Sequence, residues 1–274
     1  MICAKLSQFV GLTVTIWVFF RGSISHTVEC MYGTLERYRE LDALRGIAVL
    51  CMITYHFFFD IAYFYWYDIE VFTGAWKLFA RGTGAIFLLA VGICAVISWE
   101  RTEKKERIWK ALKRGMIIFA CGMIISAVTW IIAPHSFVKF GILHLIGISA
   151  LLQPIFSVFK KWNAVIGLLF VIVGISFTTK PVESWLLFPF GLEYPGMQSL
   201  DYYPLFPWFG VILIGMALGQ WLYRPARHRV CTSLGSIAYP LPLLWCGRRA
   251  LLLYFLHQPV ILFILMSFLG VPLP

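Results

Sequence analysis

Long apolar runs alternate with short polar segments along most of this sequence. A membrane-spanning helix needs about 20 mainly apolar residues, and seven of the runs reach or approach that length. No polar stretch between them is long enough to form a second domain. The pattern therefore predicts an all-α, polytopic transmembrane helix bundle of about seven spans. The expected spans cover residues 43–64, 82–99, 115–133, 141–159, 163–179, 204–223 and 249–269.

The composition supports a membrane protein. Hydrophobic residues make up 60% of the 274 residues, and charged residues make up only 13%. A soluble domain carries about 25% charged residues. The formal net charge is +10, but the basic residues lie in short segments between the apolar runs. Basic residues distributed in this way set the orientation of a membrane protein in the bilayer. The positive charge therefore needs no nucleic acid to explain it, and we expect no nucleic-acid partner.

The basic residues favour alternate loops. Seventeen Lys and Arg residues would fall on one side of the membrane and four on the other, if the spans alternate in direction. Loops rich in Lys and Arg stay in the cytoplasm, so the C-terminus is predicted to lie outside. The larger set is Arg37, Arg39, Arg45, Arg101, Lys104, Lys105, Arg107, Lys110, Lys113, Arg114, Lys160, Lys161, Arg224, Arg227, Arg229, Arg248 and Arg249; the smaller set is Lys77, Arg81, Lys139 and Lys180.

The N-terminal residues differ from the rest. Residues 6–20 are apolar and are followed by Arg21, but this run is short for a span. It resembles a signal-peptide core without a clear small-x-small cleavage site. An upstream start codon before Met31 and an additional helix are two other interpretations, and all three remain open. We expect one membrane-embedded domain over residues 35–274, preceded by this unassigned segment, 1–34.

One predicted helix carries a line of polar groups. The stretch ELDALRGIAVLCMITYHFFFD, residues 40–60, is largely apolar but contains Asp42, Arg45, His56 and Asp60. On a helix all four fall within an arc of about 60°, and the rise from the first to the last is roughly 27 Å. A charge near the bilayer centre costs at least about 2.5 kcal/mol. The four groups are therefore functional candidates that face the bundle interior or a wet cavity.

The two ends of this polar line allow different interpretations. Asp42 and Arg45 lie near the end predicted to be cytoplasmic, where they fit a helix cap and an interfacial anchor as well as a binding site. His56 and Asp60 lie deeper, and their i, i+4 spacing allows a hydrogen bond. Such a bond would orient the imidazole and raise its basicity, as a general base requires. A structural polar pair is the alternative.

Two further histidines lie in predicted spans. FGILHLIGIS contains His144, and YFLHQPV contains His257 and Gln258. A single helical histidine is usually a packing residue, but three deep histidines in one small bundle favour a site. A haem or metal protein that uses His56, His144 and His257 is one alternative. The seven cysteines form no CxxC pair and most lie in apolar runs. We therefore interpret them as buried small side chains and expect no metal.

Two segments on the predicted outer side combine aromatic and charged residues. They are DYYPLFPWFG, residues 201–210, and YWYDIEVFTGAWKLFAR, residues 65–81. An aromatic belt at the membrane edge is one explanation. The other is a sugar-binding platform, because flat rings stack on sugar faces and carboxylates accept hydroxyl hydrogen bonds. The substrate-binding candidates are Arg81, Asp201, Tyr203 and Trp208.

Five motifs in order resemble a known family. RYRELDALRGIAVLCMITYHFFFD resembles the opening signature of the heparan-alpha-glucosaminide N-acetyltransferase catalytic-domain family, in its short prokaryotic form. The resemblance continues through GAIFLLAVGICAVIS, FGILHLIGIS, DYYPLFPWFGVILIGMALG and GRRALLLYFLHQPV, and covers about residues 35–270. Arg45, ten residues and then His56 are also similar to the Arg-x10-His pattern of membrane acyltransferases that decorate surface polysaccharides.

The resemblance implies an integral membrane acyltransferase in the plasma (inner) membrane of a prokaryote. Such enzymes take acetyl from the co-substrate acetyl-CoA on the cytosolic side and transfer it to a sugar amine or hydroxyl on the other side. The implied partners are the bilayer, acyl-CoA and a saccharide acceptor, and a homo-oligomer stays open. The implied donor-binding residues are Arg45, Asp42 and Gln258, and the implied catalytic residues are His56, Asp60, His144 and His257.

The sequence also departs from the family. The lysosomal members have a candidate catalytic histidine in the first outer loop, shortly before a tryptophan. The matching region here is EVFTGAW, and no histidine occurs between positions 57 and 134. At the position of His56 those enzymes, as we align them, have asparagine. A histidine relay in that loop is thus excluded, and the heparan substrate is not carried over.

A membrane transporter or flippase for a small polar or lipid-linked solute is the alternative function. Aspartate and histidine inside a membrane also serve as proton relays. Many transporters, however, contain inverted repeats or paired broken helices, and the sequence has neither pattern.

Overall fold

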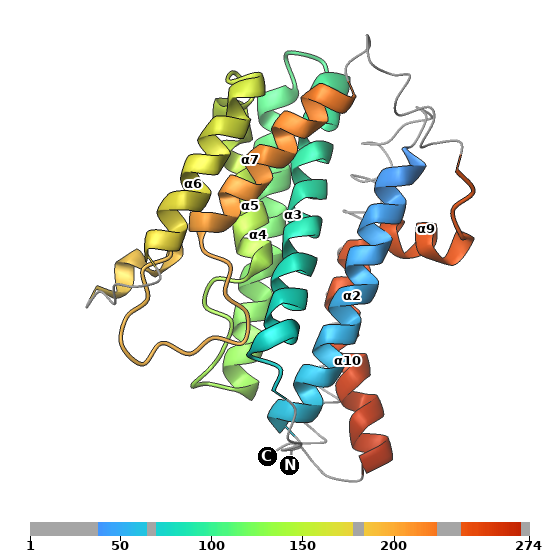
Figure 1. Ribbon diagram of the computed structural model, residues 1–274, viewed down its shortest axis with the longest axis vertical. Coiled ribbons are helices and arrows are strands. Elements are labelled where there is room, and N and C mark those ends of the chain that lie inside the picture. The colour runs from blue at the N-terminus through green and yellow to red at the C-terminus, as the bar shows by residue number, and fades with distance from the viewer. Residues whose placement is uncertain (1–37, 65–69, 178–183, 224–236, 270–274) are drawn as a thin grey trace. The chain divides into compact units, whose positions relative to one another are not determined.

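The computed structural model describes residues 38–64, 70–177, 184–223 and 237–269. The N-terminal segment 1–34, with its three interpretations, lies outside the described residues. All named elements in the described part are helices (Figure 1). They are α2 (Arg39–Phe64), α3 (Gly74–Arg101), α4 (Arg107–Ile132), α5 (Ile142–Phe156), α6 (Asn163–Phe177), α7 (Leu205–Leu222), α9 (Leu241–Arg248) and α10 (Ala250–Leu269), with 3-10 helices η1 (Lys160–Trp162) and η2 (Trp185–Phe190).

Each of the seven expected spans coincides with one of these helices. Six helical segments are long and apolar enough to cross a membrane. The helix at the fourth expected span, α5, is also apolar but has only 15 residues. The all-α transmembrane architecture predicted from hydropathy is thus confirmed.

The structure corrects three details of the expected helices. α3 begins at Gly74 and α4 at Arg107, well before the expected starts at 82 and 115. Hydropathy places these first turns outside the spans because they carry Lys77 and Arg81 in α3 and several basic residues in α4. The third difference is α9, a short helix that begins after Pro240 within a segment expected to be a loop.

The chain divides into two compact units, residues 1–87 with 233–274 and residues 88–232. In the first unit, α2 packs against both α9 and α10 (Figure 1). Two glycines allow the close contact of α2 with α9. A Cβ atom on Gly46 would meet the carbonyl oxygen of Leu243, and one on Gly247 would meet the carbonyl oxygen of Asp42. Small residues permit such close helix contacts in membranes.

In the second unit, α4 packs against α5, and α6 packs against α7. Gly215 and Gly219 of α7 face the part of α3 that belongs to this unit. A Cβ atom on Gly215 would meet the carbonyl oxygen of Leu89, and one on Gly219 would lie 3.0 Å from the Cα atom of Ile93. This GxxxG step is therefore a helix-packing contact.

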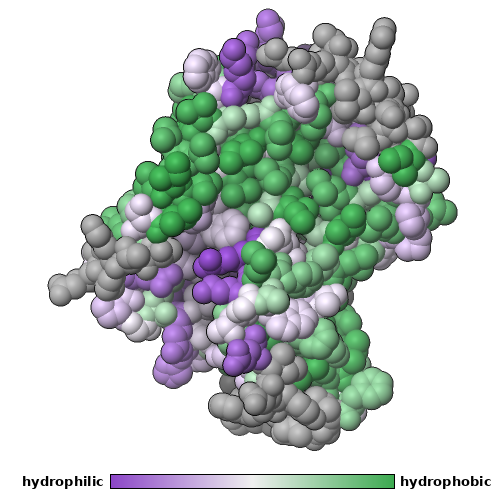
Figure 2. All heavy atoms as spheres, in the orientation of Figure 1, coloured by the Kyte–Doolittle hydropathy of each residue, from purple (hydrophilic) through white to green (hydrophobic). Residues whose placement is uncertain are grey.

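In the second unit, the connections rich in basic residues lie at one end, as expected if successive spans alternate in direction. The α3–α4 connection, the start of α6 and the end of α7 lie at the same end of this unit (Figure 1). Hydrophobic side chains cover much of the helical surface between the two ends (Figure 2). On α6 they include Val165, Leu168, Leu169, Ile172 and Ile175, which are all exposed. Such a surface suits lipid and not water.

Candidate active site

The polar line of the sequence lies on a single unbroken helix, α2, in the first unit. Its two halves meet different neighbours. Asp42 contacts α9 through Arg248, and Asp60 contacts α10 through Gln258. The line predicted from helical periodicity is therefore covered by α9 near one end and by α10 near the other.

The deeper half forms a polar cluster with α10, made of His56, Asp60, His257 and Gln258. The ring centroids of His56 and His257 lie 4.9 Å apart at an interplanar angle of 54°. Asp60 has an exposed fraction of 0%, although it is a carboxylic acid. The Nε2 atom of Gln258 donates to its Oδ1 atom at 3.3 Å. We call these four residues the α2–α10 cluster.

The protonation pattern of His257 follows from one backbone contact. Its Nδ1 atom lies 2.8 Å from the carbonyl oxygen of Tyr254. A carbonyl oxygen only accepts hydrogen bonds, so Nδ1 carries the proton in the neutral ring and Nε2 keeps a free lone pair. This Nε2 atom is buried and has no hydrogen-bond partner among the residues that the structure describes. A buried imidazole with a fixed tautomer and an available lone pair is suited to act as a general base.

Every residue of the α2–α10 cluster has a buried polar atom that no group in the described part of the chain pairs with. These atoms are Nδ1 of His56, Oδ2 of Asp60, Nε2 of His257 and Oε1 of Gln258. Buried polar groups are almost always hydrogen-bonded, and leaving one unpaired costs about 1–3 kcal/mol. Four such atoms in one cluster are costly for stability alone. They are explained if the cluster binds a polar group of a substrate.

The structure does not contain the hydrogen bond expected between His56 and Asp60. Oδ1 of Asp60 accepts from Gln258 instead, and Oδ2 of Asp60 and Nδ1 of His56 have no partner. An i, i+4 spacing places two residues on one face of a helix, but the neighbouring helix decides where each side chain points. Here α10 supplies an amide for Asp60 and an imidazole ring for His56. The expectation of a His56–Asp60 bond was therefore wrong.

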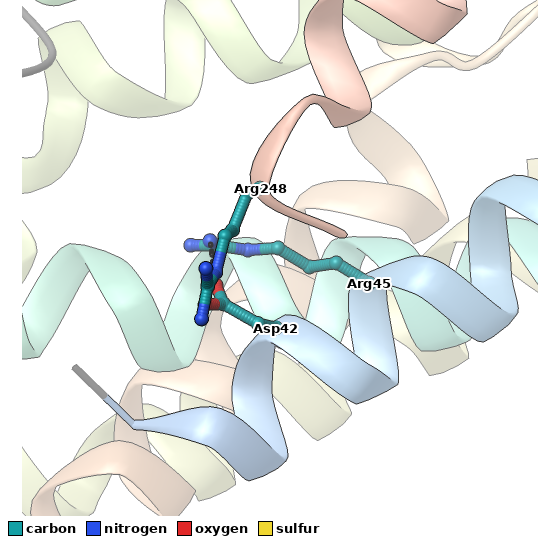
Figure 3. A network of polar contacts seen from close by, with 3 residues as sticks. All are labelled: Asp42, Arg45 and Arg248. Atoms are coloured by element: carbon teal, nitrogen blue, oxygen red, sulfur yellow. Dashed lines mark hydrogen bonds and ion pairs between the residues drawn. The ribbon is translucent and has the colours of Figure 1, made fainter. Parts of the chain in front are cut away.

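The other half of the polar line is an ion-pair network of three residues (Figure 3). The Oδ1 atom of Asp42 lies 3.6 Å from a guanidinium nitrogen of Arg45, and its Oδ2 atom lies 3.3 Å from Nε of Arg248. Asp42 is buried. One carboxylate thus holds two guanidinium groups, and the network keeps one net positive charge. That charge is compatible with the predicted donor-binding role of Arg45, which stays a prediction.

Replacing Asp42 by asparagine should lower the thermal stability of the protein. The substitution keeps the side-chain shape but leaves two neighbouring guanidinium groups without their shared carboxylate. Arg248 is 44% exposed, so water screens part of the effect, and we expect a loss of about 1 kcal/mol. Thermal unfolding in detergent should show that D42N combined with Arg248→Gln recovers part of the loss. Equal stability of D42N and the wild type would contradict this role.

His144 lies in the second unit, whereas the other three predicted catalytic residues lie in the first. Both of its ring nitrogens have partners. The N–H group of Gly141 donates to its Nδ1 atom at 3.2 Å, so Nε2 carries the proton and lies 3.3 Å from the hydroxyl oxygen of Ser126. Ser126 in turn donates to the carbonyl oxygen of Val138. These contacts join α4 and α5 to the turn between them, so we expect a structural role for His144, and its catalytic role stays a prediction.

A His144→Leu substitution tests that assignment. It would leave the buried N–H group of Gly141 without an acceptor, so we expect a stability loss of about 1–3 kcal/mol. Acyl transfer per folded molecule should be retained. Thermal unfolding and transfer, both normalised to monodisperse protein, measure the two effects, with the exposed His135→Ala as the control. Full stability with lost transfer would instead support the original catalytic prediction.

Three of the predicted substrate-binding residues lie in the second unit. Asp201 accepts a hydrogen bond from the N–H group of Ile142 at 3.0 Å, in the first turn of α5. Its carboxylate therefore caps that helix. The rings of Tyr203 and Trp208 lie 4.8 Å apart, and both residues are half-buried. Their role in binding a sugar stays a prediction, as does that of Arg81, an exposed residue of α3.

Tyr202 and Tyr203 are anchored by hydrogen bonds to neighbouring parts of the chain. The N–H group of Tyr203 donates to the carbonyl oxygen of Phe140 at 2.9 Å. The hydroxyl of Tyr202 donates to the carbonyl oxygen of Phe188 at 2.6 Å. Burial, and then the negative charge of Glu193, raise the pKa of Tyr202 above its ordinary value. The hydroxyl thus keeps its proton and remains a hydrogen-bond donor at physiological pH.

Comparison with known protein families shows which family this chain belongs to. The family described as heparan-alpha-glucosaminide N-acetyltransferase, catalytic, matches residues 37–259, which is well over half of the sequence. The chain belongs to this family. The matched region contains the ion-pair network and the whole α2–α10 cluster. A search of the curated proteins gave no match, and a search of the solved structures gave none either.

Membership of the heparan-alpha-glucosaminide N-acetyltransferase catalytic family implies a membrane acetyltransferase. It does not favour the transporter alternative. For the haem or metal alternative, the residues that the structure describes contain no group of three or more His, Cys, Asp or Glu side chains able to hold a metal ion.

Sequence reasoning missed the part played by Arg248. It was counted only among the basic residues that set orientation, although it shares the carboxylate of Asp42. The distance of 206 positions between the two residues hides this pairing. Charge balance offers no signal either, because Arg45 three positions away already balances the charge of Asp42.

Proposed function

We propose that this protein transfers an acyl group, typically acetyl, from acyl-CoA to an amine or hydroxyl of a sugar. The observation that carries the proposal is the buried, unpaired Nε2 atom of His257 within the α2–α10 cluster. Acyl transfer to an amine or hydroxyl needs a base at the attacking atom. A histidine with its other nitrogen fixed by a backbone carbonyl meets that need.

In the proposed reaction, the nitrogen or oxygen of the acceptor attacks the carbonyl carbon of the thioester. Its proton passes to Nε2 of His257 as the new C–N or C–O bond forms. The C–S bond then breaks, and the proton returns from Nε2 to the departing sulfur of CoA. No other reactant is needed, and His257 ends the cycle as it began.

The other cluster residues are suited to holding the acceptor. Oδ2 of Asp60 and Oε1 of Gln258 can each accept a hydrogen bond from a sugar amine or hydroxyl. The hydrogen bond between Gln258 and Asp60 fixes the orientation of both groups. His56 contacts the ring of His257 and offers a further polar atom, Nδ1. These assignments explain why a membrane helix pair keeps four such residues.

The orientation of the reaction follows from the distribution of basic residues. We place Asp42, Arg45 and Arg248 at the cytoplasmic end, where acyl-CoA is available, and the C-terminus outside. A net positive charge at the mouth of the polar line suits a polyanionic donor. The acceptor would reach the α2–α10 cluster from the other side. We place the protein in the plasma (inner) membrane of a prokaryote.

Thermal unfolding of the purified protein with acetyl-CoA tests the proposed donor. A ligand at about 100 times its dissociation constant adds about 2.7 kcal/mol to the stability of the folded state. We expect acetyl-CoA to raise the unfolding temperature and ATP, as a charge control, to leave it unchanged. The absence of a shift at saturating acetyl-CoA would argue against acyl-CoA as the donor.

A further inference from the structure

A pocket in the second unit gathers three basic side chains. It lies among α3, α4 and α5, and none of its residues takes part in the proposed proton transfer. The residues that matter for its chemistry are the cations Arg107, Lys110 and Arg114, the hydroxyls of Ser98 and Thr102, and the amide of Gln153. Among the described residues that line it, none is Asp or Glu. We call it the cationic pocket.

The three cations share one face of α4. Their spacing of three and then four residues keeps them within an arc of about 60°. Arg107, Lys110 and Arg114 are all half-buried, whereas Lys113 on the same helix is exposed. The exposed basic residues of this end also include Arg101, Lys104, Lys105, Lys160 and Lys161. The pocket therefore differs from the general positive charge of the loops.

Existing contacts engage only one of the three cations. Nε of Arg107 donates to the carbonyl oxygen of Thr102 at 2.9 Å, and its guanidinium lies 5.8 Å from the ring of Trp99. For Lys110 and Arg114, the described part of the chain provides no side-chain hydrogen bond or ion pair. The three nearby glutamates at the α3–α4 connection are exposed and outside the pocket. They are Glu100, Glu103 and Glu106.

The position of these cations opposes a general rule of helix electrostatics. The N-terminus of a helix carries a partial positive charge, so acidic residues stabilise it and basic residues do not. The N-cap of α4 is acidic, Glu106, but Arg107 and Lys110 lie in the first turn that follows it. An anion in the pocket would relieve the repulsion among the side chains and the helix end.

We propose that the cationic pocket binds a phosphate group. Arginine binds phosphate through paired N–H donors, and lysine binds it as a point charge. The helix N-terminus and the two hydroxyls add further donors to an anion. The phosphates of coenzyme A are one source of this chemistry, and that source rests on the proposed function. The phosphate of an acidic lipid headgroup offers the same chemistry.

Coenzyme A affinity of the full-length protein, measured by equilibrium titration in a non-ionic detergent, tests the proposal. Lys110→Gln and Arg114→Gln should each weaken binding roughly 10-fold, the effect of one charge-assisted hydrogen bond. Lys113→Gln, the matched control on the exposed face, should bind like the wild type. Pantetheine, which lacks phosphates, should bind all four proteins equally. Higher salt should reduce the difference between the wild type and the pocket variants.

A second arm measures retention of phosphatidylglycerol against phosphatidylcholine by the same four proteins. Weaker binding of coenzyme A by the two pocket variants supports the donor as the source. Loss of phosphatidylglycerol retention alone supports the phosphate site with a lipid as its source. If the wild type binds coenzyme A and the variants change neither ligand, the pocket proposal is overturned while the proposed function stands. If the wild type binds neither phosphate ligand, the pocket proposal is overturned as well, and failure to bind coenzyme A also counts against the proposed function.

Discussion

Replacing His257 by alanine should lower acyl transfer about 10²–10⁴-fold, the usual contribution of a general base. The reason is the lone pair on Nε2, which stays unprotonated because the contact with the Tyr254 carbonyl places the proton on Nδ1. No other cluster residue has a basic nitrogen fixed in this way. Binding of acetyl-CoA should change little, because the substitution touches neither of the proposed donor contacts, the ion-pair network and the cationic pocket.

Three measurements separate a general base from a structural residue at this position. Release of the CoA thiol with an amino-sugar acceptor gives the rate, and thermal unfolding confirms that His257→Ala is folded. Added imidazole should restore part of the transfer, because it can occupy the vacated space and accept the proton. His56→Ala should also lower transfer but with a smaller effect, whereas the exposed His135→Ala should match the wild type. Full turnover by folded His257→Ala would remove this residue from the mechanism.

Replacing Gly247 by valine should prevent α9 from packing on α2. A Cβ atom at this position would overlap the carbonyl oxygen of Asp42, which belongs to the backbone and cannot move away alone. Overpacking a close contact usually costs about 1–3 kcal/mol, and a clash with backbone is at the upper end or beyond. The displacement would also separate Arg248 from Asp42 and so break the ion-pair network. We therefore expect little monodisperse protein and a much lower unfolding temperature.

Gly82→Ala is the matched control for this substitution. Gly82 also lies in a membrane helix, but a Cβ atom there would have no neighbour within 4 Å. Size-exclusion profiles and unfolding temperatures of the two variants give the comparison. If Gly247→Val were as stable as Gly82→Ala, α2 and α9 would not be in the close contact described.

The helices of this fold could be predicted from the sequence because a bilayer imposes a simple length and hydropathy requirement. The polar line on α2 could also be predicted, since helical periodicity fixes which residues share a face. What periodicity does not fix is the neighbour of that face. The pairing of Asp60 with Gln258, and of Asp42 with Arg248, depends on contacts between segments almost 200 or more positions apart.

The same limit hides the partners of other residues that the sequence singles out. The hydrogen bond expected between His56 and Asp60 assumed that the nearest partner on the helix would be the best one. For His144, the partners are a backbone N–H group in its own first turn and a serine on α4. For Asp201, the partner is the start of α5. The contacts of His144 with Ser126 and of Asp201 with Ile142 depend on how the loops fold back, for which the sequence has no periodic signal.

The central claim is that the α2–α10 cluster transfers an acyl group from acyl-CoA to a sugar. The most direct measurement incubates the purified wild-type protein with acetyl-CoA and a glucosaminide. Free CoA thiol and acetylated sugar are then quantified together, the sugar by mass spectrometry. We predict acceptor-dependent release of CoA, with one acetylated sugar formed for each thiol. Thiol release that does not depend on the acceptor, or no release with any amino or hydroxyl sugar tested, would contradict the account.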